Sequence, residues 1–133
     1  MEAFRQAIEA GDADALVATL AEEVVFRSPA VHKPYQGKDE VQVILRAVMR
    51  VFEDFRYTRT WGEGADHVLL FEATVGDRRL EGADFVHTGE DGLVDDLRVM
   101  VRPLSGLDAL VAAMQQAIPE VLAELGNPTP EGV

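Results

Sequence analysis

The spacing of apolar residues changes along the chain from a helical period to a strand period and back. Four segments show helical spacing with polar residues on the opposite side, and each predicts a helix that buries one face. Their apolar stripes are Phe4, Ala7 and Ile8; Leu16, Val17 and Leu20; Val41, Ile44, Leu45, Val48 and Phe52; and Leu107, Leu110, Val111, Met114 and Ile118.

Capping and breaking residues predict where these helices begin and end. Gly11 ends the first helix, and Asp12 caps the second. Ser105, which Asp108 follows three residues later, predicts the start of the last helix. Pro119 lies inside that helix, where proline removes a backbone hydrogen bond, and it predicts a kink or a restart.

Between the third and fourth helices, apolar and polar residues alternate with the period of two that is typical of β-strands. Gly76–Asp77 and the GEDG segment at 89–92 predict tight turns between these strands. A short strand at 24–29 comes before the long helix, and a loop that contains Pro34 and Gly37 follows it. The consecutive strands are predicted at 54–61, 67–75, 80–87 and 93–103.

Strands that follow one another with short turns form an antiparallel sheet, and the helices gathered before them must cover one of its faces. The sequence therefore predicts an α+β fold in which a strongly curved, mainly antiparallel sheet wraps around N-terminal helices and carries a C-terminal helix. One domain is expected over residues 1–126, with a flexible tail at 127–133. Such a sheet leaves a pocket between its concave face and the helices.

Composition and charge narrow the range of partners. The chain of 133 residues is 47% hydrophobic, and its 24 acidic and 12 basic residues give a net charge of -12. A charge of this sign repels nucleic acid and anionic membrane surfaces, so neither is expected as a partner. The chain has no cysteine, no apolar run long enough to span a bilayer, and a first segment unlike a signal peptide. We therefore expect a cytoplasmic protein.

Asp84 is the most informative polar residue, because it stands in the middle of the predicted strand 80–87. Alternation places it on one face with Leu80, Gly82 and Val86, and this face is expected to turn inward. An apolar lining would raise the pKa of the Asp84 carboxyl group and make it an acid or a hydrogen-bond donor. Gly82 would then leave room for a ligand to approach the backbone.

A structural role for Asp84 is the alternative. Arg98 or Arg102 on the next predicted strand would form a salt bridge with it, and a carboxylate held in a salt bridge would have no chemical task. The sequence leaves both interpretations open.

Other polar and aromatic residues are weaker candidates. His32 and Tyr35 lie in the loop before the long helix, where His32 either moves a proton near neutral pH or is only solvated. Tyr57, Arg59 and Trp61 share a predicted strand face, which either lines the pocket or contacts a partner subunit. No two histidines have a ligand spacing, so no metal is expected, and no motif indicates a cofactor.

Three segments together resemble the nuclear transport factor 2-like superfamily: AGDADALVATLAEEVVFRSP, YQGKDEV and the two strands on either side of GEDG. Within it the chain is similar to the SnoaL-like branch, which also contains the ketosteroid isomerases. The resemblance spans about Phe4 to about Leu110 and implies a cone of curved sheet closed by helices, an internal apolar pocket and, in many members, a dimer. Members include isomerases, polyketide cyclases, hydrolases, dehydratases and binding domains, so the fold does not choose an activity.

For the ketosteroid isomerases, the resemblance implies three pocket groups: an Asp base, and a Tyr and a protonated Asp that hold an oxyanion. Ser28 stands at the place of the base, Phe4 at the place of the Tyr and Asp84 at the place of the protonated Asp. Ser28 has no base of its own and Phe4 cannot donate a hydrogen bond, so steroid isomerisation by that mechanism is not expected. Polyketide cyclases of the SnoaL type need an inward acid, a role that Asp84 fits.

The expected function is therefore binding of a small, largely apolar molecule by a homodimer, with isomerase- or cyclase-type acid–base chemistry carried by Asp84 and His32. A non-catalytic ligand-binding domain and a protein-interaction domain are the alternatives. The residues expected to contact the bound molecule are Phe4, Phe26, Ser28, Tyr35, Tyr57, Trp61, Phe71 and Val99.

Overall fold

The structure is a computed structural model that describes residues 1–126, so the predicted tail at 127–133 lies outside the described residues. Residues 1–126 form four helices and one six-stranded sheet, which confirms the predicted α+β class. The helices are α1 (Glu2–Ala10), α2 (Ala13–Ala18), α3 (Lys38–Val51) and α4 (Leu104–Glu124). The strands are β1 (Leu20–Arg27), β2 (Tyr35–Gln36), β3 (Glu53–Glu63), β4 (Asp66–Val75), β5 (Arg78–Thr88) and β6 (Val94–Arg102).

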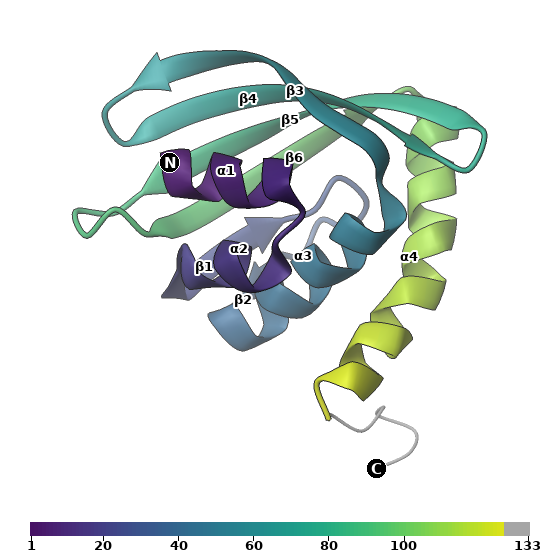
Figure 1. Cartoon of the computed structure of the whole chain (residues 1–133), viewed down its shortest axis with the longest axis horizontal. Coiled ribbons are helices and arrows are strands. Elements are labelled where there is room, and N and C mark those ends of the chain that lie inside the picture. The colour runs from purple at the N-terminus through teal and green to yellow at the C-terminus, as the bar shows by residue number, and fades with distance from the viewer. Residues whose placement is uncertain (127–133) are drawn as a thin grey trace.

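The sheet is mainly antiparallel, as predicted, and its strands lie in the order β2-β1-β6-β5-β4-β3. Only β1 and β6 run parallel to each other in the described part of the sheet. The turn between β4 and β5 falls at Gly76–Asp77, where Gly76 has the positive φ of 60° that such a turn requires. Figure 1 shows the long strands arching over α1, with α2 and α3 on the same side and α4 along one end of the sheet.

Two elements near the start of the sheet differ from the prediction. The second helix ends at Ala18, and Leu20, which was assigned to its buried stripe, begins β1 instead. Leu20 is still fully buried, because its side chain enters the core from the strand, opposite Val94 of β6. Tyr35 and Gln36 form the short strand β2 within the predicted loop, since two residues are too few to show an alternating pattern.

The last helix begins and continues differently from the prediction. It starts at Leu104, and the carbonyl of Pro103 accepts the first helical hydrogen bond from the Leu107 N–H at 3.0 Å, so Ser105 is not the cap. The helix also runs through Pro119 without a restart. Pro119 and Gln115 are both exposed, so water can satisfy the Gln115 carbonyl that loses its partner.

A β-bulge divides the aromatic face that was predicted for β3. The register between β3 and β4 shifts between Tyr57, which pairs with Phe71, and Arg59, which pairs with Leu70. The extra residue turns Tyr57 towards the helices and sends Arg59 and Trp61 to the outer face of the sheet. The prediction that these three side chains share one face is therefore wrong, because a one-residue shift exchanges the two faces of a strand.

Candidate functional site

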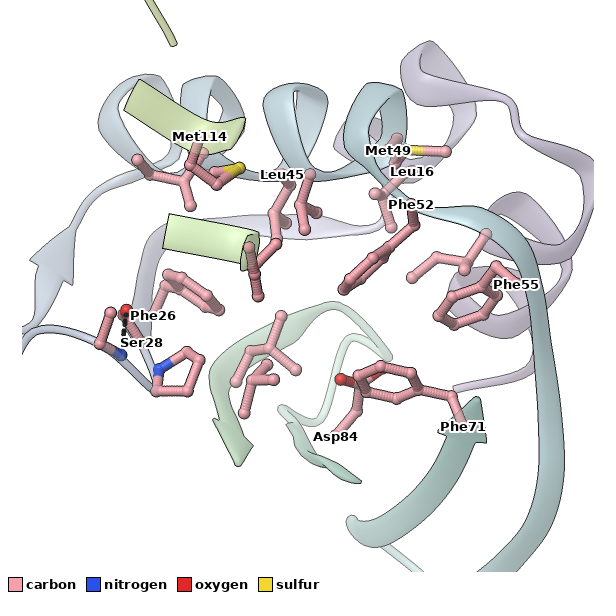
Figure 2. A pocket seen from close by; sticks show the side chains of 18 of the residues that line it. Leu16, Phe26, Ser28, Leu45, Met49, Phe52, Phe55, Phe71, Asp84 and Met114 are labelled. Carbon is pink, nitrogen blue, oxygen red and sulfur yellow. Dashed lines mark hydrogen bonds between the residues drawn. The ribbon is translucent and has the colours of Figure 1, made fainter. Parts of the chain in front are cut away.

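A cavity of about 520 Å³ lies between the inner face of the sheet and helices α1, α3 and α4. Phenylalanines provide much of its wall, and α3 and α4 add aliphatic and methionine side chains. Figure 2 shows these side chains pointing towards a common space, with Met114 and Leu45 across from Asp84. The cavity is as large as pockets that hold small organic molecules, typically about 300–1,000 Å³. The aromatic residues of the wall are Phe4, Phe26, Tyr35, Phe52, Phe55 and Phe71.

Few polar side chains reach this cavity. Within the described residues its lining contains no lysine, arginine or histidine, and its two ionisable acids are Glu9 and Asp84. Glu9 is exposed on α1 and pairs with Arg5 at 3.4 Å, whereas Asp84 is only 6% exposed. The buried acid of this cavity is therefore Asp84.

The alternation of β5 directs Asp84 inward, as the sequence predicts. Its partner is Tyr57, whose hydroxyl donates a hydrogen bond to Asp84 Oδ2 at 2.7 Å. Neither arginine that was considered as a partner contacts it: Arg98 is exposed on the outer face, and Arg102 pairs with Glu81 at 3.3 Å. Asp84 is thus a buried carboxyl group with no ion pair in the described chain.

This environment changes the protonation of Asp84. Burial raises the pKa of the Asp84 carboxyl group from 3.8 to about 7, and the hydrogen bond from Tyr57 acts in the opposite direction. Burial and the adjacent Asp84 carboxylate both raise the pKa of Tyr57 above its ordinary value, so its hydroxyl stays protonated. Near neutral pH the cavity therefore contains a carboxyl group that is protonated in a large fraction of the molecules.

Most of the residues predicted to act on or contact a ligand line this cavity, but three do not. Tyr57 is not part of the lining, and its hydroxyl contacts Asp84 instead. Trp61 lies on the outer face, 44% exposed, with the Arg59 guanidinium 4.7 Å from its ring centre. His32 is exposed in its loop and does not line the cavity. The predicted residues that do line it are Phe4, Phe26, Ser28, Tyr35, Phe71, Asp84 and Val99.

Sequence reasoning missed the contribution of the two long helices to the cavity. Val48, Met49 and Phe52 come from α3 and the residue after it, and Leu110 and Met114 come from α4. Several of these belong to the apolar stripes that were assigned to the core. The pattern showed that the stripes are buried, but periodicity cannot distinguish a helix face that packs against other side chains from one that borders a cavity.

Ser28 lines the cavity, and its side chain is bonded to the backbone of the loop that follows it. Its Oγ accepts hydrogen bonds from the backbone N–H groups of Ala30 at 3.0 Å and Val31 at 3.4 Å. These bonds close a serine turn at the start of the loop that lines the cavity. No carboxylate or imidazole contacts Ser28 in the part of the chain that the structure describes, so the position of the isomerase base holds no base.

The room beside Gly82 is filled from within the protein. A Cβ atom on Gly82 would lie 2.3 Å from Phe71 Cζ and 2.8 Å from the carbonyl oxygen of Met100. The expectation that a ligand approaches the backbone at Gly82 is therefore wrong, because the Phe71 ring already occupies that space. Gly82 instead leaves room for the Phe71 ring, and Phe71 and Asp84 both line the cavity (Figure 2).

Within residues 1–126, no group of three or more His, Asp or Glu residues is arranged to hold a metal ion. None of the described helices has the length and apolar character needed to cross a membrane.

Comparisons with known proteins agree with this architecture. Residues 1–97 match the model of the SnoaL-like domain. Among solved structures, a steroid delta-isomerase from Pseudomonas aeruginosa is 43% identical, with a TM-score of 0.85 over 90% of this chain and 89% of that chain. An uncharacterised protein with a cystatin-like fold from Silicibacter pomeroyi is 36% identical, with a TM-score of 0.82 over 86% of this chain and 82% of that one.

More distant structures share the fold alone. An NTF2-like protein of unknown function from Mesorhizobium loti is 16% identical, with a TM-score of 0.69 over 77% of this chain and 88% of that chain. No curated protein matches the chain in sequence.

Proposed function

The chain belongs to the SnoaL-like domain family, and from that premise we propose that it binds a neutral, largely apolar carbonyl compound in its internal cavity. In the bound state, protonated Asp84 donates a hydrogen bond to the carbonyl oxygen. This contact is the acid half of an isomerase- or cyclase-type reaction. The observation that carries the proposal is the Asp84 carboxyl group, which is buried in a largely apolar cavity and has a raised pKa.

The charge of the cavity favours a neutral ligand. Two carboxylic acids, Glu9 and Asp84, line it, and no cation of the described chain does. A ligand with a carboxylate would lose its water without gaining a partner, which is strongly unfavourable in an apolar site. A ketone or enone carbonyl needs only one donor, and protonated Asp84 supplies one. The steroid delta-isomerase that resembles this chain supports a polycyclic ketone as the kind of molecule to test first.

A non-catalytic binding domain is the second candidate, and the residues at two positions favour it. Ser28 stands where the isomerases have their base, and its oxygen is engaged with backbone N–H groups. Phe4 stands where they have a tyrosine, and it is buried without any hydrogen-bonding group. With the acid half present and these two groups missing, the cavity could hold a ketone and leave it unchanged.

The proposal predicts that ketone binding weakens as the pH rises. Because the donor proton leaves Asp84 near pH 7, the affinity for 2-acetylnaphthalene should fall more than about tenfold between about pH 5.5 and about pH 8.5. Titration calorimetry measures this affinity. The matched ligand 2-ethylnaphthalene has a similar shape and no carbonyl, so its affinity should not change with pH. In Asp84→Asn the pH dependence should disappear, and equal pH profiles for the two ligands would refute the carbonyl contact.

The same variant separates the two candidates. An unconjugated steroid ketone gives a conjugated, ultraviolet-absorbing product when it is isomerised. Turnover in the wild type that Asp84→Asn abolishes would support acid–base chemistry. Ketone binding without turnover in the wild type would support the non-catalytic candidate.

We also propose that the outer face of the sheet binds a second copy of the chain. Trp61, Phe85 and Met100 are 44%, 37% and 54% exposed there. Positive and negative side chains lie next to these apolar residues, so the face can be complementary to itself across a twofold axis. Three rows of paired residues cross it from β3 to β6: Arg56–Glu72–Glu81–Arg102, Arg59–Leu70–Ala83–Met100 and Trp61–Val68–Phe85–Arg98.

A charge placed in this face should dissociate the dimer. Phe85→Arg puts a cation beside Arg98, its neighbour on β6, and should raise the dissociation constant about thirtyfold or more. Leu104→Arg is the control, because Leu104 is an exposed apolar residue that lies outside these rows. Sedimentation equilibrium measures both constants. A monomeric wild type, or equal effects of the two variants, would contradict the proposed dimer face.

A further inference from the structure

The hydroxyl group of Tyr57 has one acceptor within the described chain. It donates to Asp84 Oδ2 at 2.7 Å, and it contacts no other hydrogen-bond acceptor in residues 1–126. Tyr57 also lies outside the cavity lining, so a bound ligand does not compete for this bond. The Tyr57 proton is therefore committed to one oxygen of Asp84.

The second oxygen of Asp84 faces the cavity. Oδ1 forms no hydrogen bond with any described residue, but it is not one of the fully buried polar atoms without a partner, which are Arg27 Nε and His67 Nδ1. Oδ1 therefore keeps some accessible surface. Because Asp84 lines the cavity and is otherwise buried, that surface belongs to the cavity.

From these two contacts we infer that Tyr57 is a positioning residue that holds the acid proton of Asp84 on Oδ1, the oxygen that faces the ligand. A neutral carboxyl group can carry its proton on either oxygen, and Tyr57 occupies the acceptor site on Oδ2. The remaining tautomer points its O–H into the cavity. The inference rests on the proposed function, since its consequence is a donor that is already aimed at a carbonyl oxygen before the ligand arrives.

The surroundings of Tyr57 hold its ring in place. Phe55 and Phe71 contact it edge to face, with ring centres 4.9 Å and 6.4 Å away. The bulge of β3 follows Tyr57 directly, so the strand turns outward only after this side chain has been directed inward. Bulges are common next to functional sites because they re-aim side chains in this way.

The charged groups near Tyr57 and Asp84 come from helix α1. Glu9 and Arg5 of α1 act on Tyr57 with opposite signs, and they form an ion pair with each other. On the strands that flank Asp84, its pairing partners are the apolar residues Leu69 and Val99. The titration of Asp84 is therefore governed by its burial and by the bond from Tyr57.

Removing the Tyr57 hydroxyl should raise the pKa of Asp84 and yet weaken ketone binding. Loss of a merely structural residue would not produce this combination. In Tyr57→Phe the pKa of Asp84 should rise above the wild-type value, because the bond that favours its ionised form is gone. Ketone binding should nevertheless weaken, by about fivefold for 2-acetylnaphthalene at about pH 5, where Asp84 is protonated in both proteins. A higher pKa of Asp84 together with weaker ketone binding is the signature of an Asp84 proton that is no longer oriented towards the ligand.

The experiment titrates protein labelled with ¹³C at the Asp carboxyl carbons, with the Asp84 signal identified by its loss in Asp84→Asn. Tyr35→Phe is the matched control: the chain has two tyrosines, and Tyr35 lines the cavity without contacting Asp84. It should leave the pKa of Asp84 unchanged. Calorimetry with 2-acetylnaphthalene and 2-ethylnaphthalene completes the comparison.

A second measurement keeps the inference testable if Tyr57→Phe does not fold. In the Tyr35→Phe background Tyr57 is the one remaining tyrosine, so fluorotyrosine labels it alone. The more acidic phenol donates a stronger bond, and the pKa of Asp84 should fall. An unchanged pKa in both experiments, or full ketone affinity in Tyr57→Phe, would overturn the positioning role. Equal binding of the two naphthalenes by the wild type would instead refute the proposed function, while the titration would still decide the role of Tyr57.

Discussion

Raising the pH from about 4 to about 7 is expected to lower the free energy of unfolding by roughly 4 kcal/mol through Asp84 alone. The pKa of this carboxyl group is about 7 in the folded protein and close to 3.8 in an unfolded chain, because folding removes it from water. Each pH unit between these two values corresponds to about 1.4 kcal/mol. Few single side chains are expected to change the stability of a domain by so much.

The sign follows from proton binding. Between the two pKa values, folded Asp84 keeps its proton and unfolded Asp84 has lost it, so the folded state binds more protons. Stability must then decrease as the pH rises through this range. Above about pH 7 the group is ionised in both states, and below about pH 4 it is protonated in both, so its contribution is constant on either side.

Urea unfolding of the wild type and of Asp84→Asn over this pH range measures the effect. The comparison is needed because other groups titrate too: Arg50 lowers the pKa of Glu124, which opposes the trend, and Asp95 raises the pKa of His87. These groups contribute equally to both proteins, so the difference isolates Asp84. Parallel stability curves for the two proteins would show that Asp84 ionises normally in the folded state.

The loss of stability that Asp84 causes at neutral pH is linked to the proposed function. A buried carboxyl group without a cation is unfavourable for folding at neutral pH, and an apolar residue in its place would not have this cost. The same burial keeps the group protonated and able to donate to a ligand. Active sites commonly carry such locally unfavourable groups, and here the opposing requirements meet at one side chain.

The sequence predicted the inward acid because β5 has regular alternation along its whole length. Its buried residues fall at every second position, so the direction of Asp84 follows from the period alone. The same reasoning failed in β3, where the bulge after Tyr57 exchanges the two faces. A bulge depends on how two strands pair, and the pattern of one strand does not contain that information. Trp61 was therefore assigned to the wrong face.

The hydrogen-bond partner of Asp84 also could not be predicted from the sequence. Tyr57 and Asp84 lie on strands that are separated by β4, and the curvature of the sheet brings their side chains together. Local patterns predict neighbours on one strand or across one turn. A contact that spans two strand spacings depends on the bending of the whole sheet, so the sequence pattern indicates the arginines of the next strand as partners instead.

Gly82→Ala is expected to destabilise the protein by about 3 kcal/mol, which is a large effect for the addition of one methyl group. The new Cβ would lie 2.3 Å from Phe71 Cζ and 2.8 Å from the backbone oxygen of Met100. Movement of the Phe71 ring relieves only the first overlap, because the second involves the backbone of β6, which is paired with β5. Phe52 and Phe55 pack against Phe71, with ring centres 5.6 Å and 5.1 Å away, so the ring must turn towards the cavity.

Urea unfolding of Gly82→Ala beside Gly89→Ala provides the test. Gly89 also lacks a positive φ, and its added Cβ would meet only the side chains of Asp91 and Asp95 at 3.3 Å and 3.5 Å, so its substitution should change stability by less than about 0.5 kcal/mol. Phe71→Leu combined with Gly82→Ala should cost less than the sum of the single changes, because the smaller side chain removes the clash. The displaced Phe71 ring should also weaken 2-acetylnaphthalene binding, since it enters the space beside Asp84. Equal stability of the two alanine variants would mean that Phe71 does not rest against Gly82, and the cavity wall would have to be redrawn at this point.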